Sequence, residues 1–331
     1  MILDGIDTAG GEHCETSTLR ILLRHAGIEL SEPMLFGLGE GLGFIYWDGK
    51  NLPFPFLGGR SKPFEITRKL SDRLGITLRA KETTSARTAW QNAAEEIEAG
   101  FPVGLQLDSY HLEYFTSKVH FGGHFTALYG YDKGTAFLVD TAQQGGAVST
   151  SLESLERARG QKGPMTAKNR SFTLRAQVPL KSLPDVIRAA VRANAAEFLD
   201  PPIGNLGYRG IGKAAVQVRK WLDRSSDPAR DLPRLAALME RAGTGGALFR
   251  RIYREFLEEC MALVDDIGLR TAHEKYGEIA PLWTEVAHLF TRAGETGDAR
   301  YLSDASVVLS ELARCEQEAM TALAKVQPCR S

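Results

Sequence analysis

Apolar and polar positions change their pattern along the chain at about residue 180. Residues 1–180 are rich in glycine and aromatic side chains and mix helical with alternating periodicity. Residues 182–327 repeat apolar side chains at helical spacing almost throughout. Because 331 residues exceed the usual size of one domain, we expect an α+β domain over residues 1–180 and an all-α domain over residues 181–331.

In the first domain, apolar runs at helical spacing that end in a glycine predict three helices. They cover residues 16–25, 62–74 and 85–99. Strand patterns lie at 102–107, 124–131 and 136–139, with further candidates at 146–150 and 171–178. Asp132-Lys133-Gly134 is typical of a hairpin turn between two of these strands. Residues 32–45 carry a glycine at every second position from 37 to 43, which favours a tight, buried loop.

The second domain opens with a predicted helix from Pro184 to about Phe198, and Asp200-Pro201-Pro202 ends it. Five more helical patterns cover residues 207–223, 231–241, 245–265, 270–292 and 301–325. This pattern indicates a helical bundle that covers or flanks the cleft of the first domain.

Charge and composition narrow the classes of function. The net charge of −1 gives no field that would attract nucleic acid or an anionic membrane. The opening residues, MILDGIDTAGGEH, lack the basic start and the apolar run of a signal peptide. No apolar stretch reaches the roughly 18 residues of a membrane span. We therefore expect a cytoplasmic protein with no nucleic-acid or membrane partner, and the sequence leaves open whether it forms a homo-oligomer.

The four cysteines are too few and too widely spaced for a disulfide scaffold. Cys260 and Cys315 lie in helical patterns and are expected in the core, and Cys329 lies in the tail. Cys14 differs because an apolar helical pattern follows it directly. In the first turn of a helix, free N–H groups and the helix dipole favour a thiolate and can stabilise an oxyanion. Cys14 is therefore the predicted nucleophile.

A cysteine nucleophile needs a base, and the base needs an orienting group. His124 follows two glycines and opens an apolar strand pattern, and Asp140 closes the next strand pattern. Across the expected hairpin, the start of one strand lies beside the end of the other. We therefore predict that His124 is the base and that Asp140 fixes its tautomer, as in other catalytic triads.

Each of these residues also has a simpler interpretation. Cys14 could be a buried core cysteine, His124 could cap a loop, and Asp140 could form a turn. Together, Cys14, His13, His120 and His124 would also allow a zinc site. The spacings of common zinc sites, CxxC and HExxH, are absent. We therefore expect neither a metal nor a cofactor.

The order of cysteine, histidine and aspartate resembles that of papain-like and bacteriocin-processing cysteine peptidases. The segments GGHFTALYGYD and FLVDTA are similar to the histidine and aspartate segments of those folds. The resemblance implies a papain-like cysteine-peptidase fold for the first domain. One departure is that DTAGGEHC contains no glutamine, which these peptidases place before the nucleophile as an oxyanion donor. His13, a backbone N–H or a group from elsewhere must then take that role.

A second resemblance extends over both halves. The opening of the butirosin biosynthesis protein H family resembles EHCETSTLRILLRHAGIELSEPMLFGLGEGLGFIY, and that family's histidine segment is similar to HFGGHFTALYGYD. The helical domain often fused to it resembles GTGGALFRRIYREFLEEC. The family's namesake moves an acyl group from an acyl carrier protein to an amine of an aminoglycoside. The resemblance therefore implies antibiotic biosynthesis through a thioester on Cys14, with a carrier protein as donor and a small amine as acceptor.

Four further residues are candidates for substrate binding. Arg250 or Tyr253, on an arginine-rich helix, could bind an anionic group, and that helix could dock an acidic carrier protein. A solvated helix face is the alternative. His13 and Tyr46 complete the set. Three functions remain open from the sequence: acyl transfer, hydrolysis of a peptide or amide by the same residues, and non-enzymatic binding of a small molecule.

Overall fold

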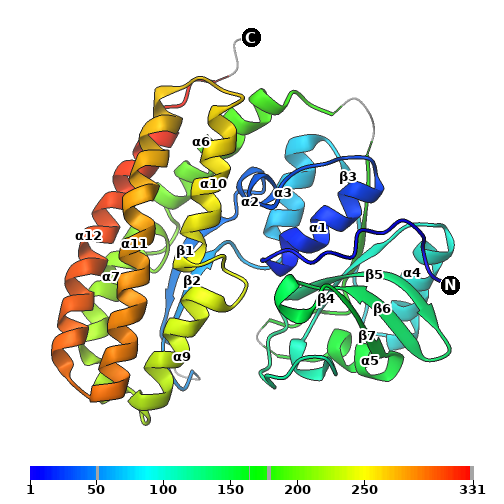
Figure 1. Cartoon of the computed structure of the whole chain (residues 1–331), viewed down its shortest axis with the longest axis horizontal. Coiled ribbons are helices and arrows are strands. Elements are labelled where there is room, and N and C mark those ends of the chain that lie inside the picture. The colour runs from blue at the N-terminus through cyan, green and yellow to red at the C-terminus, as the bar shows by residue number, and fades with distance from the viewer. Residues whose placement is uncertain (50–51, 164, 177–179, 329–331) are drawn as a thin grey trace. The chain divides into compact units, whose positions relative to one another are not determined.

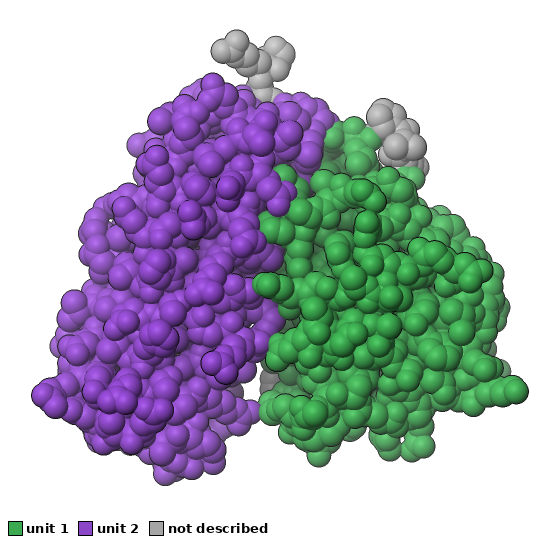
Figure 2. All heavy atoms as spheres, viewed as in Figure 1, with its two compact units in different colours: residues 1–35, 63–181 green, residues 36–62, 182–331 purple. Residues whose placement is uncertain are grey.

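The structure is a computed structural model that describes residues 1–49, 52–163, 165–176 and 180–328. The chain forms two compact units, which Figure 2 shows in different colours. Unit 1 comprises residues 1–35 and 63–181, and unit 2 comprises residues 36–62 and 182–331. The predicted fold class is confirmed, because unit 1 mixes helices with a sheet and unit 2 is mostly helical.

Unit 1 is built on a six-stranded antiparallel sheet (Figure 1). Its strands are β3 (Thr77–Lys81), β4 (Val103–Leu107), β5 (His124–Asp132), β6 (Thr135–Val139), β7 (Ala147–Ser151) and β8 (Ser171–Arg175). They lie in the order β3-β8-β4-β5-β6-β7. The predicted hairpin joins β5 to β6, and Lys133 and Gly134 both have positive φ at its turn. Part of the strand predicted at 171–178 lies outside the described residues.

Among the described residues, four α-helices belong wholly to unit 1: α1 (Cys14–His25), α3 (Glu65–Leu74), α4 (Ala86–Glu98) and α5 (Leu152–Gly160). Three of them match predicted helices, and α5 was not predicted. Ile97 of α4 and Leu155 of α5 pack with Leu105 of β4 and Leu138 of β6 in a buried apolar cluster. This cluster supports the central strands that end at the candidate site.

Unit 2 contains seven α-helices in its described part (Figure 1). They are α6 (Leu183–Leu199), α7 (Gly207–Gln217), α8 (Trp221–Arg224), α9 (Pro228–Arg241), α10 (Arg250–Met261), α11 (Ile267–Thr296) and α12 (Ala299–Ala324). The long helices α11 and α12 pack against each other. Every helical pattern predicted for the second half corresponds to one or two of these helices. None of the described helices is both long and apolar enough to cross a membrane.

The glycine-rich segment departs from the predicted buried loop. It contains α2 (Glu32–Leu38) and β1 (Leu42–Trp47), and β1 pairs with β2 (Phe56–Arg60) in a hairpin. The glycines serve close contact rather than a loop conformation. At Gly37, for example, a Cβ would lie 2.1 Å from the Phe256 ring. Gly37 and Gly41 therefore mark a backbone pressed against aromatic side chains, which are Phe256 and Phe36.

The β1–β2 hairpin belongs to unit 2, although the sequence predicted a first domain over 1–180. Its backbone is tied to the helical unit, because the Tyr46 N–H donates to the Asn205 carbonyl at 2.9 Å. The Asn194 side-chain amide donates to the Leu42 carbonyl at 2.8 Å. The hairpin thus finds its hydrogen-bond partners in the helical unit. Unit 1 ends at residue 181.

Candidate active site

Cys14 is the first residue of helix α1. His13 is the N-cap in an extended conformation, and the hydroxyl of Thr18 donates to the Cys14 carbonyl at 2.9 Å. The Cys14 side chain is buried, with the residue 9% exposed. Within the described part of the chain, no acceptor lies in hydrogen-bonding position for the Cys14 N–H. That N–H group is thus available to a ligand beside the sulfur.

The carboxylate of Glu32 anchors the turn that leads into α1. Its Oε2 accepts from the Glu12 N–H at 2.8 Å, and its Oε1 accepts from the His13 N–H at 2.7 Å. The Thr16 hydroxyl also donates to Oε1, at 2.8 Å. A carboxylate at a helix N-terminus is favoured by the helix dipole. Glu32 therefore fixes the backbone on the N-terminal side of Cys14.

His124 and Asp140 are joined by a hydrogen bond. The distance from His124 Nε2 to Asp140 Oδ2 is 2.8 Å, and both residues are buried. Ala127 pairs with Val139 across the hairpin, so continuing this register sets Asp140 opposite Thr126, two residues from His124. The two side chains are therefore diagonal rather than direct cross-strand neighbours, a spacing that long side chains can bridge.

The Cys14 side chain lies near enough to the His124 imidazole to raise its pKa. Because Asp140 occupies Nε2, Nδ1 is the ring nitrogen that remains for the sulfur. Burial alone would lower the pKa of His124, but the charge and hydrogen bond of Asp140, and then those of Cys14, raise it to about 10. A pKa raised in this direction favours the protonated imidazole at neutral pH, with the Asp140 carboxylate as the larger stabilising partner.

Both oxygens of Asp140 are occupied. Oδ2 accepts from His124 and from the Tyr114 hydroxyl at 2.7 Å, and Oδ1 accepts from the Thr141 N–H at 2.6 Å. Burial would raise the pKa of this carboxyl, but the charge and hydrogen bond of His124, followed by the hydrogen bonds of Tyr114 and Thr141, lower it. Asp140 is therefore an ionised, fixed acceptor behind the imidazole.

The segment before Cys14 also contacts the segment after Asp140. The Ala142 N–H donates to the Gly11 carbonyl at 2.8 Å, and the Gly11 N–H donates to the Ser17 hydroxyl at 2.9 Å. Residues 10–11 thus link the start of α1 to the end of β6. This link sets the position of the cysteine relative to the aspartate.

Glu15, next to Cys14, is fully buried and ties α1 to α3. Its Oε1 accepts from the Thr67 N–H at 3.0 Å and from the Thr67 hydroxyl at 2.9 Å. Its Oε2 accepts from the N–H of Phe64, the N-cap of α3, at 3.2 Å. One helix therefore supplies both the candidate nucleophile and the cap of its neighbour.

The four predicted substrate-binding residues are all buried. In unit 1, His13 Nδ1 lies 3.1 Å from the Thr16 hydroxyl. In unit 2, the Tyr46 ring stacks on Trp221, with ring centroids 6.5 Å apart, and Tyr253 contacts Phe256 and Tyr276. Each of these side chains therefore packs in the interior of its own unit.

Arg250 lies in the interior of unit 2 rather than facing a cleft. Its Nε and Nη2 donate to the two carboxylate oxygens of Glu316 at 2.8 and 2.9 Å. Its Nη1 donates to the carbonyls of Leu248 and Gly59 at 2.7 and 3.2 Å. The helix turns Arg251 and Arg254 outward instead, so the solvated-face interpretation describes those two arginines. The physical reason is that the apolar face of α10 carries Arg250 inward, where Glu316 pairs with it.

Three residues that contact the site were not predicted: Tyr114, Glu32 and Glu15. The position of Glu15 in the first turn of α1 carries no signal for its role, because its carboxylate caps the neighbouring helix α3. Tyr114 lies in an irregular loop, where no periodicity indicates which way a side chain points.

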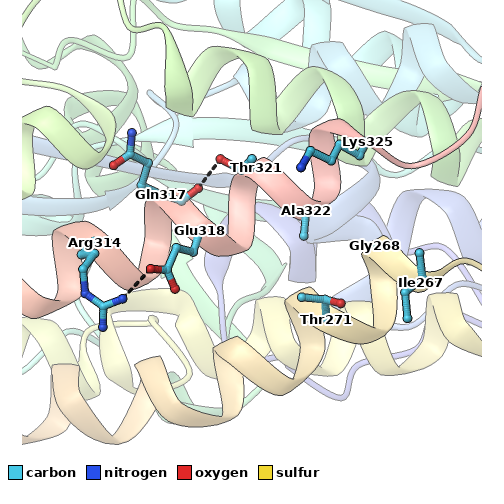
Figure 3. Close-up of a pocket in the computed structure, with 9 residues that line it drawn as sticks. All are labelled: Ile267, Gly268, Thr271, Arg314, Gln317, Glu318, Thr321, Ala322 and Lys325. Atoms are coloured by element: carbon cyan, nitrogen blue, oxygen red, sulfur yellow. Dashed lines mark hydrogen bonds and ion pairs between the residues drawn. The ribbon is translucent and has the colours of Figure 1, made fainter.

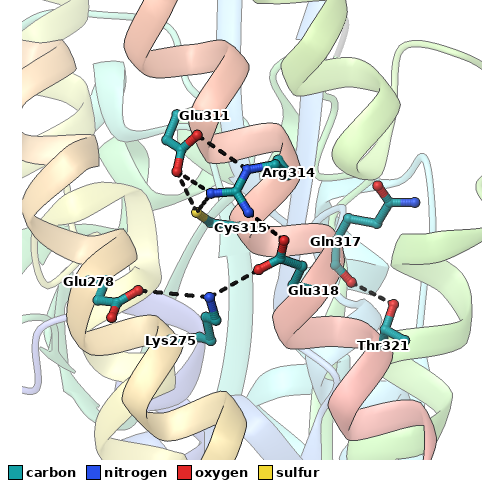
Figure 4. Close-up of polar contacts among 8 residues, drawn as sticks. All are labelled: Lys275, Glu278, Glu311, Arg314, Cys315, Gln317, Glu318 and Thr321. Carbon is teal, nitrogen blue, oxygen red and sulfur yellow. Dashed lines mark hydrogen bonds and ion pairs between the residues drawn. The ribbon is translucent and has the colours of Figure 1, made fainter.

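A groove of about 500 Å³ lies on unit 2 between α11 and α12 (Figure 3). Its nine lining residues include Arg314, Glu318 and Lys325 but no cysteine or histidine. Ion pairs cross beside it, because Glu318 accepts from Lys275 at 2.9 Å and also pairs with Arg314 (Figure 4). The Lys275–Glu318 pair joins α11 to α12 at the surface, whereas the Arg314–Glu318 pair lies within α12. Among the described residues, no three histidine, cysteine, aspartate or glutamate side chains are grouped to hold a metal ion.

The fold and the site define a class of protein: an α+β unit with a helix-terminal cysteine beside a carboxylate-backed histidine, followed by a helical unit. The chain belongs to the family described as Domain of unknown function (DUF4872), whose model matches residues 153–323. The model of Butirosin biosynthesis protein H, N-terminal, matches residues 13–141, a range that contains Cys14, His124 and Asp140. The resemblance to the butirosin biosynthesis protein H family is thus confirmed.

One solved structure similar to the chain is described as a C39-like peptidase from Bacillus anthracis. It shares 17% sequence identity and covers 53% of this chain and 97% of its own, with a TM-score of 0.38. No curated protein matches the chain.

Proposed function

We propose that this protein is a cysteine acyltransferase in which Cys14 is the nucleophile, His124 the acid and base, and Asp140 the orienting group. The observation that carries the proposal is the position of His124. Its Nε2 is hydrogen-bonded to Asp140, and the Cys14 side chain is close enough to raise the pKa of the imidazole. A protonated imidazole beside a sulfur stabilises the thiolate, which is the reactive form.

The reaction proceeds in two balanced steps. The Cys14 sulfur attacks the carbonyl of a thioester donor, and the leaving thiolate takes the proton that His124 carries. An amine then attacks the new thioester, His124 accepts its proton, and Cys14 leaves as the thiolate while an amide forms. The free N–H of Cys14 at the start of α1 would donate to the oxyanion in both steps.

The donor and the acceptor follow from the family resemblance. We propose a carrier-protein thioester as the donor and a small-molecule amine as the acceptor, in antibiotic or related secondary metabolism. The buried setting of Cys14, His124 and Asp140 supports transfer, because a shielded acyl-enzyme is better protected from water. The alternative reaction is hydrolysis by the same residues, and the experiment must distinguish it from acyl transfer.

The test uses the full chain, an acyl-N-acetylcysteamine thioester and a panel of primary amines. We expect intact-mass spectrometry to show one acyl group on Cys14, and chromatography to show an amide that depends on the amine. Cys14→Ala should lose both, whereas Cys315→Ala, a change at a buried cysteine of α12, should keep both. Free acid formed irrespective of the amine would favour a hydrolase. No adduct and no product would favour a binding protein.

A further inference from the structure

The loop between β4 and β5 is closed at its base by one buried carboxylate. Asp108 Oδ1 accepts from the N–H groups of Tyr110 and Phe121, both at 3.0 Å. Its Oδ2 lies 3.1 Å from His120 Nδ1. Asp108 therefore holds the first and last turns of residues 109–121 together. A loop fixed at both ends can place its middle residues reproducibly.

Two successive residues in the middle of this loop contact the candidate active site. The Tyr114 hydroxyl donates to Asp140 Oδ2 at 2.7 Å. The Phe115 ring meets the His124 ring edge to face, with centroids 5.1 Å apart and planes at 83°. The loop thus contacts both the carboxylate and the imidazole without supplying a reacting group.

Tyr114 shares one oxygen of Asp140 with His124. The two donors lie 2.7 and 2.8 Å from Oδ2, while the Thr141 N–H holds Oδ1. This arrangement fixes the plane of the carboxylate. Burial and the neighbouring Asp140 raise the pKa of the Tyr114 hydroxyl well above its usual range, so it stays a donor at working pH. A permanent second donor weakens the same oxygen as an acceptor for the imidazole.

We propose that Tyr114 is a positioning residue of this site, which orients Asp140 and moderates its pull on His124, and that the Asp108-closed loop holds it there. The proposal rests on the proposed function for its catalytic meaning. The positions of Tyr114 and its loop rest only on the contacts described above and do not depend on the proposed reaction. The charged or titratable groups facing His124 are Asp140 and Cys14, and those facing Asp140 are His124 and Tyr114.

Removing the hydroxyl should strengthen the bond between Asp140 and His124. In Tyr114→Phe, Oδ2 keeps the imidazole as its one donor, so the carboxylate charge stabilises the imidazolium more. We expect the pKa of His124 to rise by about half a unit to one unit, the size expected for one buried hydrogen bond. Acylation of Cys14 should slow by roughly tenfold as the carboxylate gains freedom to rotate.

The experiment follows the His124 ring by NMR titration in full-length protein with labelled histidine. Tyr110→Phe, a change at a partly exposed position of the same loop, is the matched control and should leave the pKa of His124 unchanged. A variant with 3-fluorotyrosine at position 114 keeps the ring and makes the hydroxyl a stronger donor, so it should lower the pKa of His124. This second variant keeps the test valid if Tyr114→Phe folds poorly.

If the pKa of His124 shifts in opposite directions in the two Tyr114 variants, the proposal is supported. If both variants lose thermal stability but leave the pKa of His124 unchanged, the proposal is overturned, because a purely structural contact would behave in this way. The titration needs no acyl donor, so it reads the role of Tyr114 separately from the proposed function. If Cys14→Ala retained amide formation, the acyltransferase proposal would fail while the NMR result still decided the role of Tyr114.

Discussion

The α-carbon of Gly10 lies directly against the carbonyl of Asp140. A Cβ at Gly10 would lie 2.4 Å from that oxygen and 2.3 Å from the Ala142 backbone nitrogen. Both neighbours are backbone atoms, so a side chain could fit only if the main chain shifted. The segment before the candidate nucleophile therefore packs directly against the backbone at the orienting aspartate.

A Gly10→Val change should break this contact. We expect the free energy of unfolding to fall by about 1–3 kcal/mol, as for other overpacked sites, and acylation of Cys14 to slow. Urea denaturation and intact-mass kinetics measure the two effects. Gly212 in α7 has nothing within 4 Å of an added Cβ. Gly212→Ala should therefore be neutral or stabilise by up to about 1 kcal/mol. Wild-type stability in Gly10→Val would show that the segment moves away freely.

The ion pair at His124 predicts a pH dependence of stability. The pKa of His124 is raised from 6.5 in the unfolded chain to about 10 in the folded protein. Between these two pH values, the folded state therefore holds a proton that the unfolded state has lost. The stabilising contribution of His124 is therefore complete below pH 6.5 and is lost as the pH rises through about 10. The measurement is the difference in free energy of unfolding between wild type and His124→Gln at pH 6, 8 and 10. A difference that grows with pH would contradict the assignment.

Glu32→Gln tests the anchor of the turn before Cys14. The carboxylate accepts three hydrogen bonds, and an amide group in its place must point an N–H at one of the donors. We expect a loss of about 1–3 kcal/mol in the free energy of unfolding. Glu29 is exposed, so Glu29→Gln should change stability by less than about 0.5 kcal/mol. Equal stability of both variants would mean that Glu32 does not hold the turn.

Replacing Arg250 should damage stability before it affects any substrate. Arg250→Met leaves the buried carboxylate of Glu316 without its cation, for which we expect a loss of about 3–5 kcal/mol. In Arg250→Met/Glu316→Gln the charge is gone, and the glutamine can still accept from Trp283, so part of the loss should be recovered. Arg251→Met, at an exposed position, should cost less than about 0.5 kcal/mol. Thermal denaturation measures all three, and a harmless Arg250→Met would restore the binding hypothesis.

Alkylation should single out Cys14 among the described cysteines. Burial, aided by Glu311, raises the pKa of the Cys315 thiol to about 11, and burial also raises the pKa of Cys260. We expect iodoacetamide at neutral pH to modify Cys14 at least about tenfold faster than either. Peptide mapping separates these sites from Cys329, which lies outside the described residues. His124→Gln should remove most of the advantage, and equal rates at Cys14 and Cys260 in wild type would argue against a reactive thiolate.

The sequence predicted the elements that meet at the site better than it predicted their exact alignment. A helix after Cys14 and a hairpin between His124 and Asp140 follow from local patterns, and the structure has both. The diagonal placement of the two side chains could not be predicted, because a register shift near Gly130 displaces the pairing. A period-two pattern carries no signal for such a shift.

Contacts between distant segments account for most of what the sequence left open. Tyr114 is 26 residues from Asp140, and its loop has no periodicity that fixes its direction. The sequence offered Arg250 either as an anion-binding residue at a cleft or as part of a solvated helix face, and neither interpretation places it in the interior, which arginines usually avoid. Its partner Glu316 is 66 residues away and was not predicted to face it. Buried ion pairs of this kind depend on tertiary contacts that local patterns do not encode.

Strand β8 occupies an interior place in the sheet, between β3 and β4, although it belongs to the region matched by the DUF4872 model. Conversely, the β1–β2 hairpin lies in the region matched by the butirosin biosynthesis protein H model but completes the helical unit. The two matched regions are thus interleaved, each lending a segment to the other's unit. A gene fragment ending at residue 141 would encode a sheet missing an inner strand and a hairpin stripped of its support. We therefore expect that neither matched region forms its complete unit when it is expressed alone.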